Sequence, residues 1–176
     1  MSKVITFSPR FPSYHPKRGK ETYFVHKFWQ AIGIPYNRSQ FTDPILLKLY
    51  DAYEQTDYLY GKNTTIRKGR RWKKGEYFSP RIWSGIPYRS KQISIWQDVL
   101  ITNVWNVEIH NIKGEIKIFL MPDGLLKRYY KPKELNIDEV AKNDGLTTQD
   151  LIDWFAVEED RPFKGQIICW NPDVNY

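Results

Sequence analysis

The sequence predicts a single domain of mixed α+β structure. Its 176 residues are 41% hydrophobic and 16% aromatic, which is enough apolar surface for one packed core. Segments that alternate apolar and polar residues predict strands, and segments with apolar residues three or four positions apart predict helices. No internal repeat and no linker separates the two kinds of segment, so we expect one domain over residues 1–176.

The first third of the chain predicts one strand and two helices. Residues 4–7 form a short strand pattern that Ser8-Pro9 ends. A loop rich in proline, glycine and charge follows, and a helical pattern then covers residues 22–32. Thr42 or Asp43 caps a second helix, which has proline at its first position and ends near Gln55.

The middle of the chain predicts mainly β structure. Residues 92–96 and 99–109 alternate as strands do, with the apolar positions of the longer range on one face. Residues 111–114 predict a hairpin turn, and residues 115–120 predict the returning strand. A further turn is expected at residues 122–124.

Two short helices and a final strand are predicted near the C-terminal end. The helices cover residues 137–142 and 148–155, and Gly145 stops the first because glycine tolerates a positive φ. Thr147 or Thr148 caps the second. Residues 165–170 predict the last strand.

The positive charge of the chain is local. The formal net charge is +7, but residues 61–91 hold ten lysines or arginines and one acid, Glu76. The rest of the chain is slightly acidic, with 17 bases and 19 acids. A local basic surface attracts phosphate, which indicates RNA, DNA or a nucleotide as partner. The alternative is a solvated basic face that binds no ligand.

The stretch Lys62-Asn-Thr-Thr-Ile-Arg67 carries the candidate chemistry. It brings together an amine, two hydroxyls and a guanidinium beside a turn that contains glycine. A hydroxyl such as that of Thr65 becomes a nucleophile when a base takes its proton, and a lysine can do so when burial lowers its pKa. The alternative is that Thr64 and Thr65 are ordinary strand residues and that Lys62 is solvated.

A basic segment with interspersed aromatic residues follows this stretch. Arginine and lysine contact phosphate, and a tryptophan such as Trp72 can stack on a base, although Trp72 is equally suited to a core position. The candidate nucleic-acid-binding residues are Arg67, Arg70, Arg71, Trp72, Lys73, Arg81 and Arg89.

Several other function classes are not supported by the sequence. The three histidines lie far apart and there is one cysteine, so no metal site and no cofactor is expected. Neither a phosphate-binding glycine loop nor a serine nucleophile elbow occurs. The apolar context of Cys169 indicates a buried thiol. No apolar run is long enough to span a membrane and no secretory signal is present, so a cytoplasmic location is expected.

The order of these motifs resembles the ASCH domain of the PUA-like superfamily. The similarity lies in Lys62-x-x-Thr65-x-Arg67, in the step Gly75-Glu76 into a strand, and in residues 141–151 followed by Trp154-Phe155. The resemblance implies a small mixed β-barrel with peripheral helices, and it marks residues 21–56 as a helical insertion. It covers mainly residues 62–109 and 140–170.

One branch of that superfamily removes the acetyl group from acetylcytidine, with a lysine, a threonine and a glutamate as the proposed catalytic set. By motif, the resemblance assigns these roles to Lys62, Thr65 and Asp144, with aspartate in place of glutamate. We therefore expect binding of RNA, DNA or a modified nucleoside. The alternatives are a metal-independent amidohydrolase and a protein-interaction domain, and the oligomeric state stays open.

Overall fold

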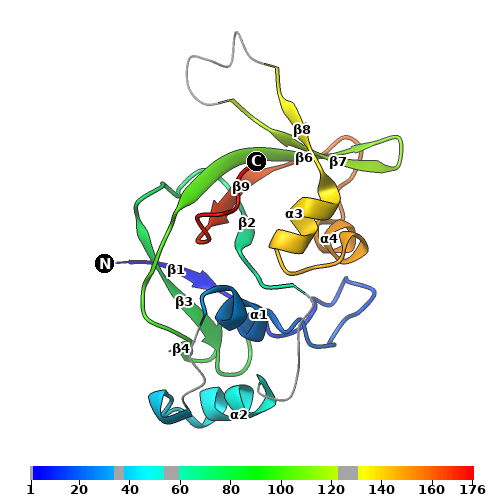
Figure 1. The fold of residues 1–176 in the computed structure, drawn as a ribbon. Helices are drawn as coiled ribbons and strands as arrows, with labels where there is room; N and C mark the ends of the chain where they lie inside the picture. The colour runs from blue at the N-terminus through cyan, green and yellow to red at the C-terminus, as the bar shows by residue number, and fades with distance from the viewer. Residues whose placement is uncertain (1, 34–37, 54–59, 123–130) are drawn as a thin grey trace.

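The computed structural model describes residues 2–33, 38–53, 60–122 and 131–176, and it shows the predicted α+β fold (Figure 1). Four α-helices and nine strands lie in these described ranges, and the strands form two separate sheets. Two predicted features lie outside the described residues. They are the end of the second helix near Gln55 and, apart from Pro122, the turn at residues 122–124.

The first sheet is built around β3 (Tyr77–Trp83). This strand pairs in parallel with β1 (Lys3–Thr6), and antiparallel with β4 (Gln92–Ser94) and β5 (Val99–Leu100). Gly75 has φ 85° in the turn before β3, a conformation that favours glycine. Within β3, Phe78, Ser79, Pro80 and Ile82 are buried, whereas Tyr77, Arg81 and Trp83 are more accessible.

The second sheet is antiparallel throughout and has β9 (Phe163–Cys169) beside its edge strand β2 (Thr64–Lys68). Beyond β9 lie β6 (Asn103–Ile112), β7 (Glu115–Leu120) and β8 (Lys133–Leu135). The hairpin between β6 and β7 occurs where the sequence predicts it. The strand β8 was not predicted, because its three residues show no clear alternation.

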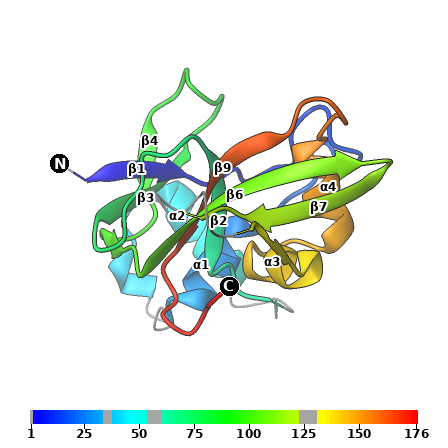
Figure 2. The same cartoon turned by 90° about the horizontal axis from the view of Figure 1, so that it is seen from above.

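The helices flank the two sheets. The core side of α1 (Phe24–Ala31) is buried, and α2 (Pro44–Tyr53) starts with its proline and is capped by Asp43. Near the second sheet, α3 (Ile137–Asn143) and α4 (Thr148–Phe155) follow one another, as Figures 1 and 2 show. These bounds agree with the predicted helices to within about two residues.

The predicted β-barrel is not observed as a closed barrel among the described residues, because no strand pairing joins the two sheets. The predicted strand over residues 99–109 is also interrupted, and the interruption explains the separation. The Ile101 N–H donates to the Glu76 carbonyl beside the first sheet, and the Thr102 N–H donates to the Cys169 carbonyl of the second. The chain therefore passes from one sheet to the other at this point.

A side-chain hydrogen bond connects the edge strands β1 and β2. The Arg67 Nη2 of β2 donates to the Thr6 carbonyl of β1 at 2.6 Å. Both strands have one hydrogen-bonded neighbour in the described sheets, so each is an edge strand of its sheet. The predicted catalytic residues Lys62, Thr65 and Asp144 line a cavity that Thr6 and Arg67 also line.

Two further expectations concern the core and the membrane. Cys169 is fully buried, as its apolar context predicts, and burial raises the pKa of its thiol. Among the helices that the structure describes, none is long and apolar enough to cross a membrane.

Candidate functional site

A buried ion pair forms the centre of the candidate site. Lys62 and Asp144 are 82 positions apart, yet the Lys62 Nζ lies 3.0 Å from the Asp144 Oδ1. The same Nζ donates to the Asp144 carbonyl oxygen at 2.7 Å. The exposed fractions of the two residues are 1% and 6%, so the pair is almost wholly withdrawn from solvent.

Backbone contacts fix the lysine just before β2 begins. The Lys62 N–H donates to the Lys27 carbonyl of α1, and the Asn63 N–H donates to the Asn143 carbonyl at the end of α3. Residues 62 and 65 would point to opposite faces of a straight strand. Because Lys62 precedes the strand and is tied to two helices, it shares a cavity with Thr65.

The end of α3 fixes the aspartate. Asp144 is the C-cap residue of this helix, and Gly145 follows with φ 75°. A Cβ at Gly145 would lie 3.2 Å from the Lys62 Cβ and from the Lys27 Cδ. The glycine predicted as a helix stop therefore also allows the loop to approach the lysine closely.

Thr65 and Arg67 complete the polar wall of the cavity, which has a volume of 60 Å³. They lie on the same face of β2 because they are two positions apart. The Arg67 Nη2 is bound to Thr6, whereas its buried Nε has no hydrogen-bond partner among the described residues. An unpartnered buried donor beside a hydroxyl can bind an oxygen that enters the cavity.

Aromatic side chains form the opposite wall. The Lys62 Nζ lies 4.1 Å from the centroid of the Phe24 ring, a cation–π contact. Phe7 of the segment after β1, and Trp154 and Phe155 of α4, also line the cavity. Phe24 was not predicted as a site residue, because its helical spacing indicates only a core position.

Burial makes the ion pair responsive to pH. Desolvation lowers the pKa of Lys62 to about 8, against the opposing charge of Asp144, while Arg67 and Lys27 add to the lowering. Desolvation also raises the pKa of Asp144, although Lys62 counteracts the change. This lowering of the Lys62 pKa favours the neutral amine, the form that a general base requires.

The other predicted basic residues fall into two groups along the chain. Arg70, Arg71 and Lys73 are exposed in the connection between β2 and β3. Arg81 is half-buried on β3, opposite Thr6 in the strand register, and Arg89 is exposed between β3 and β4. Of the seven predicted binding residues, only Arg67 lines the cavity itself.

Trp72 occupies the core, so its predicted stacking on a base is not supported. Only 3% of the residue is exposed, and Gln166 binds its backbone N–H and carbonyl. Cations lie against its ring, with the Lys3 Nζ 5.6 Å and the Arg71 guanidinium 5.1 Å from the centroid. A base could reach this indole only by displacing them.

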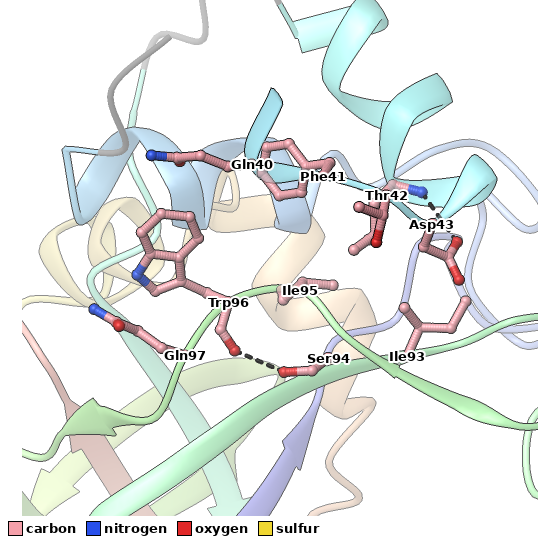
Figure 3. A pocket seen from close by; sticks show the side chains of 10 residues that line it. Gln40, Phe41, Thr42, Asp43, Ile93, Ser94, Ile95, Trp96 and Gln97 are labelled. Atoms are coloured by element: carbon pink, nitrogen blue, oxygen red, sulfur yellow. Dashed lines mark hydrogen bonds between the residues drawn. The ribbon is translucent and has the colours of Figure 1, made fainter. Parts of the chain in front are cut away.

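A larger cavity of 490 Å³ lies between the start of α2 and the chain after β4 (Figure 3). Its walls include Gln40 and Phe41 on one side and Trp96 and Gln97 on the other, and the two aromatic rings are 6.4 Å apart. None of the predicted site residues is among its described lining residues. The candidate chemistry therefore rests on the smaller cavity.

Within the described ranges, no group of three or more histidine, cysteine, aspartate or glutamate residues is placed to hold a metal ion. The polar side chains that line the candidate site are the amine of Lys62, the carboxylate of Asp144, the guanidinium of Arg67 and three hydroxyls, those of Thr6, Ser8 and Thr65. This set is suited to proton transfer and to anion binding. Comparisons of this chain with protein-family models, with curated proteins and with solved structures found no match.

Proposed function

We propose that this chain is an amidohydrolase with an ASCH-like fold, which removes a small acyl group from a modified nucleobase such as acetylcytidine. The observation that carries the proposal is the buried Lys62–Asp144 pair in one cavity with Thr65 and Arg67. The resemblance of the motif Lys62-x-x-Thr65-x-Arg67 to ASCH domains supports the same assignment. The two-sheet α+β architecture is compatible with it.

The size of the cavity supports a small acyl group. Its 60 Å³ is room for a few water molecules, at about 10–15 Å³ each. An acetyl group, with three heavy atoms, has a similar size, whereas a whole nucleoside is far larger. The acyl group would enter the cavity, and the base would remain at its mouth near Arg67.

The chemistry follows from the roles that these side chains can take. Neutral Lys62, held by Asp144, accepts the proton of the Thr65 hydroxyl, and the Thr65 Oγ1 attacks the acyl carbon. The free Nε–H of Arg67 stabilises the oxyanion. Lys62 then gives its proton to the departing amine of the base, leaving an ester on Thr65. Water attacks this ester, passes a proton through Lys62 to the threonine oxygen, and releases acetate.

The acyl-transfer experiment uses two adjacent threonines as a matched pair. Thr64 and Thr65 are both buried, but only Thr65 lines the cavity, and the Thr64 Oγ1 has no hydrogen-bond partner in the described part of the chain. We expect the wild-type chain and Thr64→Val to release acetate from acetylcytidine, and Thr65→Val to release none above background. Intact-mass spectrometry should detect one acetyl group on the active chains during turnover.

The outcome separates the proposal from its alternatives. Equal acetate release by Thr65→Val would remove the threonine from the mechanism. No release by the wild-type chain at any pH between about 6 and 10 would contradict the proposal, because Lys62 passes through both protonation states in that range.

The rate should rise with pH. Neutral Lys62 is the reactive base, so we expect kcat/KM to increase toward a plateau above pH 8, the pKa to which burial lowers this lysine. Asp144 opposes that lowering, so Asp144→Asn should reduce the maximal rate and move the midpoint to lower pH. A pH–rate profile of both proteins measures this, and a midpoint that rises in Asp144→Asn would contradict the assigned pairing.

Binding without hydrolysis is the second candidate function. The exposed cations Arg70, Arg71 and Lys73 favour it, because phosphate contacts need no reactive pocket. In that case the chain should bind RNA or DNA with a strong dependence on salt and release no acetate.

A further inference from the structure

We propose that the connection between β3 and β4 is a stacking platform for single-stranded nucleic acid, so that the modified base is presented to the cavity within a strand. We call the surface formed by Arg81, Trp83, Tyr88 and Arg89 the β3–β4 platform. The proposal rests on the proposed function for the identity of the group that enters the cavity. It adds that the substrate is a single-stranded nucleic acid and that the β3–β4 platform selects it.

The exposed aromatic residues of the platform form its first support. Tyr88 is 89% exposed, and its ring centroid lies 5.4 Å from that of Trp83, which is half-buried on β3. The neighbouring Ile86 is 64% exposed. Tyr88 has φ 64°, which is uncommon for a bulky residue. The exposed ring of Tyr88, packed beside Trp83, offers a face to a base without displacing core contacts.

The pairing of β1 with β3 links the platform to the cavity. Arg81 is two positions before Trp83 on the same face of β3, and it pairs in register with Thr6. Thr6 lines the cavity and accepts a hydrogen bond from Arg67. Burial lowers the pKa of the Arg67 guanidinium, and Asp144 and Tyr88 oppose this lowering. Tyr88 is therefore close enough to Arg67 to interact with it electrostatically.

Charge makes the surface selective for a polynucleotide. Arg89 and Lys91 are exposed on the connection, Arg81 is half-buried on β3, and Arg67 lines the cavity. Glu76 is the one acid between residues 61 and 91, and it is paired with Lys3 at 2.6 Å. Cations beside exposed aromatic rings match alternating phosphates and bases.

A single strand fits this arrangement better than a duplex does. The bases of a duplex are stacked and paired, so their faces cannot reach Tyr88, whereas a single strand can turn its bases outward. The 60 Å³ cavity also requires that a base reach its mouth with the substituent pointing inward. A base in a duplex would first have to leave its stack.

The test compares two ligands and three variants. Binding of a short fluorescent single strand, as RNA and as DNA, is measured by anisotropy over a salt series, with a duplex of the same sequence as comparison. Acetate release from free acetylcytidine is measured in parallel. The variants are Tyr88→Ala, Tyr88→Phe and Ile112→Ala, the last replacing an exposed apolar residue at the end of β6.

We expect Tyr88→Ala to bind the single strand about tenfold more weakly, the effect of losing one base–aromatic stack. Tyr88→Phe, which keeps the ring, and Ile112→Ala should stay within about twofold of wild type. All three should release acetate from the free nucleoside at the wild-type rate, because that substrate does not reach the platform. Tighter binding of RNA or of DNA identifies which of the two nucleic acids carries the modified base.

Two results would contradict the proposal that the β3–β4 platform binds a single strand. One is binding by Tyr88→Ala within twofold of wild type, and the other is tighter binding of the duplex than of the single strand. Failure of the proposed hydrolysis looks different, because acetate release would then be absent while Tyr88→Ala still weakened binding of the strand.

Discussion

Replacing Lys62 by methionine should both stop turnover and destabilise the fold. Methionine keeps most of the side-chain volume but removes the amine, so we expect kcat/KM to fall by about 10²–10⁴, the contribution of a positioned general base. The change also leaves Asp144 buried without its counter-ion. Removing one partner of a buried ion pair costs about 3–5 kcal/mol, so the free energy of unfolding should decrease by that amount.

A second substitution separates these two effects. In Lys62→Met combined with Asp144→Asn, no charge is left unpaired at this position, so denaturant unfolding should show recovery of about 1–3 kcal/mol relative to Lys62→Met alone. Turnover should remain absent, because the base is still missing. A double variant that regained activity would show that the pair has only a structural role, and additive losses of stability would show that the two side chains do not interact.

Replacing Gly165 by alanine should be among the most destabilising single changes in the chain. A Cβ at this position would lie 2.3 Å from the Arg67 carbonyl oxygen and 2.6 Å from the Phe163 ring. Because β2 pairs with β9 here, backbone must move to relieve the contact. We expect the free energy of unfolding to decrease by about 3 kcal/mol or more. Turnover should also fall, because β2 carries Thr65.

Gly85→Ala is the matched control for backbone crowding. Its nearest neighbour would be the Ser90 Cβ at 3.6 Å, an ordinary contact, so its stability should stay within about 0.5 kcal/mol of wild type. Chemical denaturation of the wild type, Gly165→Ala and Gly85→Ala measures both changes in the free energy of unfolding. Equal midpoints for Gly165→Ala and Gly85→Ala would show that the β2–β9 ladder accommodates a methyl group at no cost.

Local patterns predicted the elements well and the site in part. The helices are marked by caps, as at Asp43 and Thr147, and the β6–β7 hairpin is marked by its turn residues. Lys62, Thr65 and Arg67 lie in one short motif, so their chemistry could be inferred together. The contact with Asp144 depended on the family resemblance, because no local pattern links residues so far apart.

The remaining differences arise from tertiary structure. The alternation of residues 99–109 continues through Ile101, so it does not reveal that the chain changes sheets there. Trp72 lies in a basic segment, and only the packing around Gln166 shows that it is buried. The predicted helical insertion contributes Phe24 to the site and Trp29 to the core, because α1 packs between distant segments.

The buried thiol of Cys169 is a probe for the opening of β2, the strand that carries Thr65 and Arg67. It is the single cysteine, it is fully buried, and it pairs with Thr64 of β2 on one side and with Asn103 of β6 on the other. A thiol reagent can therefore modify it only when these strands separate or the chain unfolds. The labelling rate of the unmodified protein thus reports how often the strand that carries Thr65 and Arg67 opens, and bound substrate should slow it.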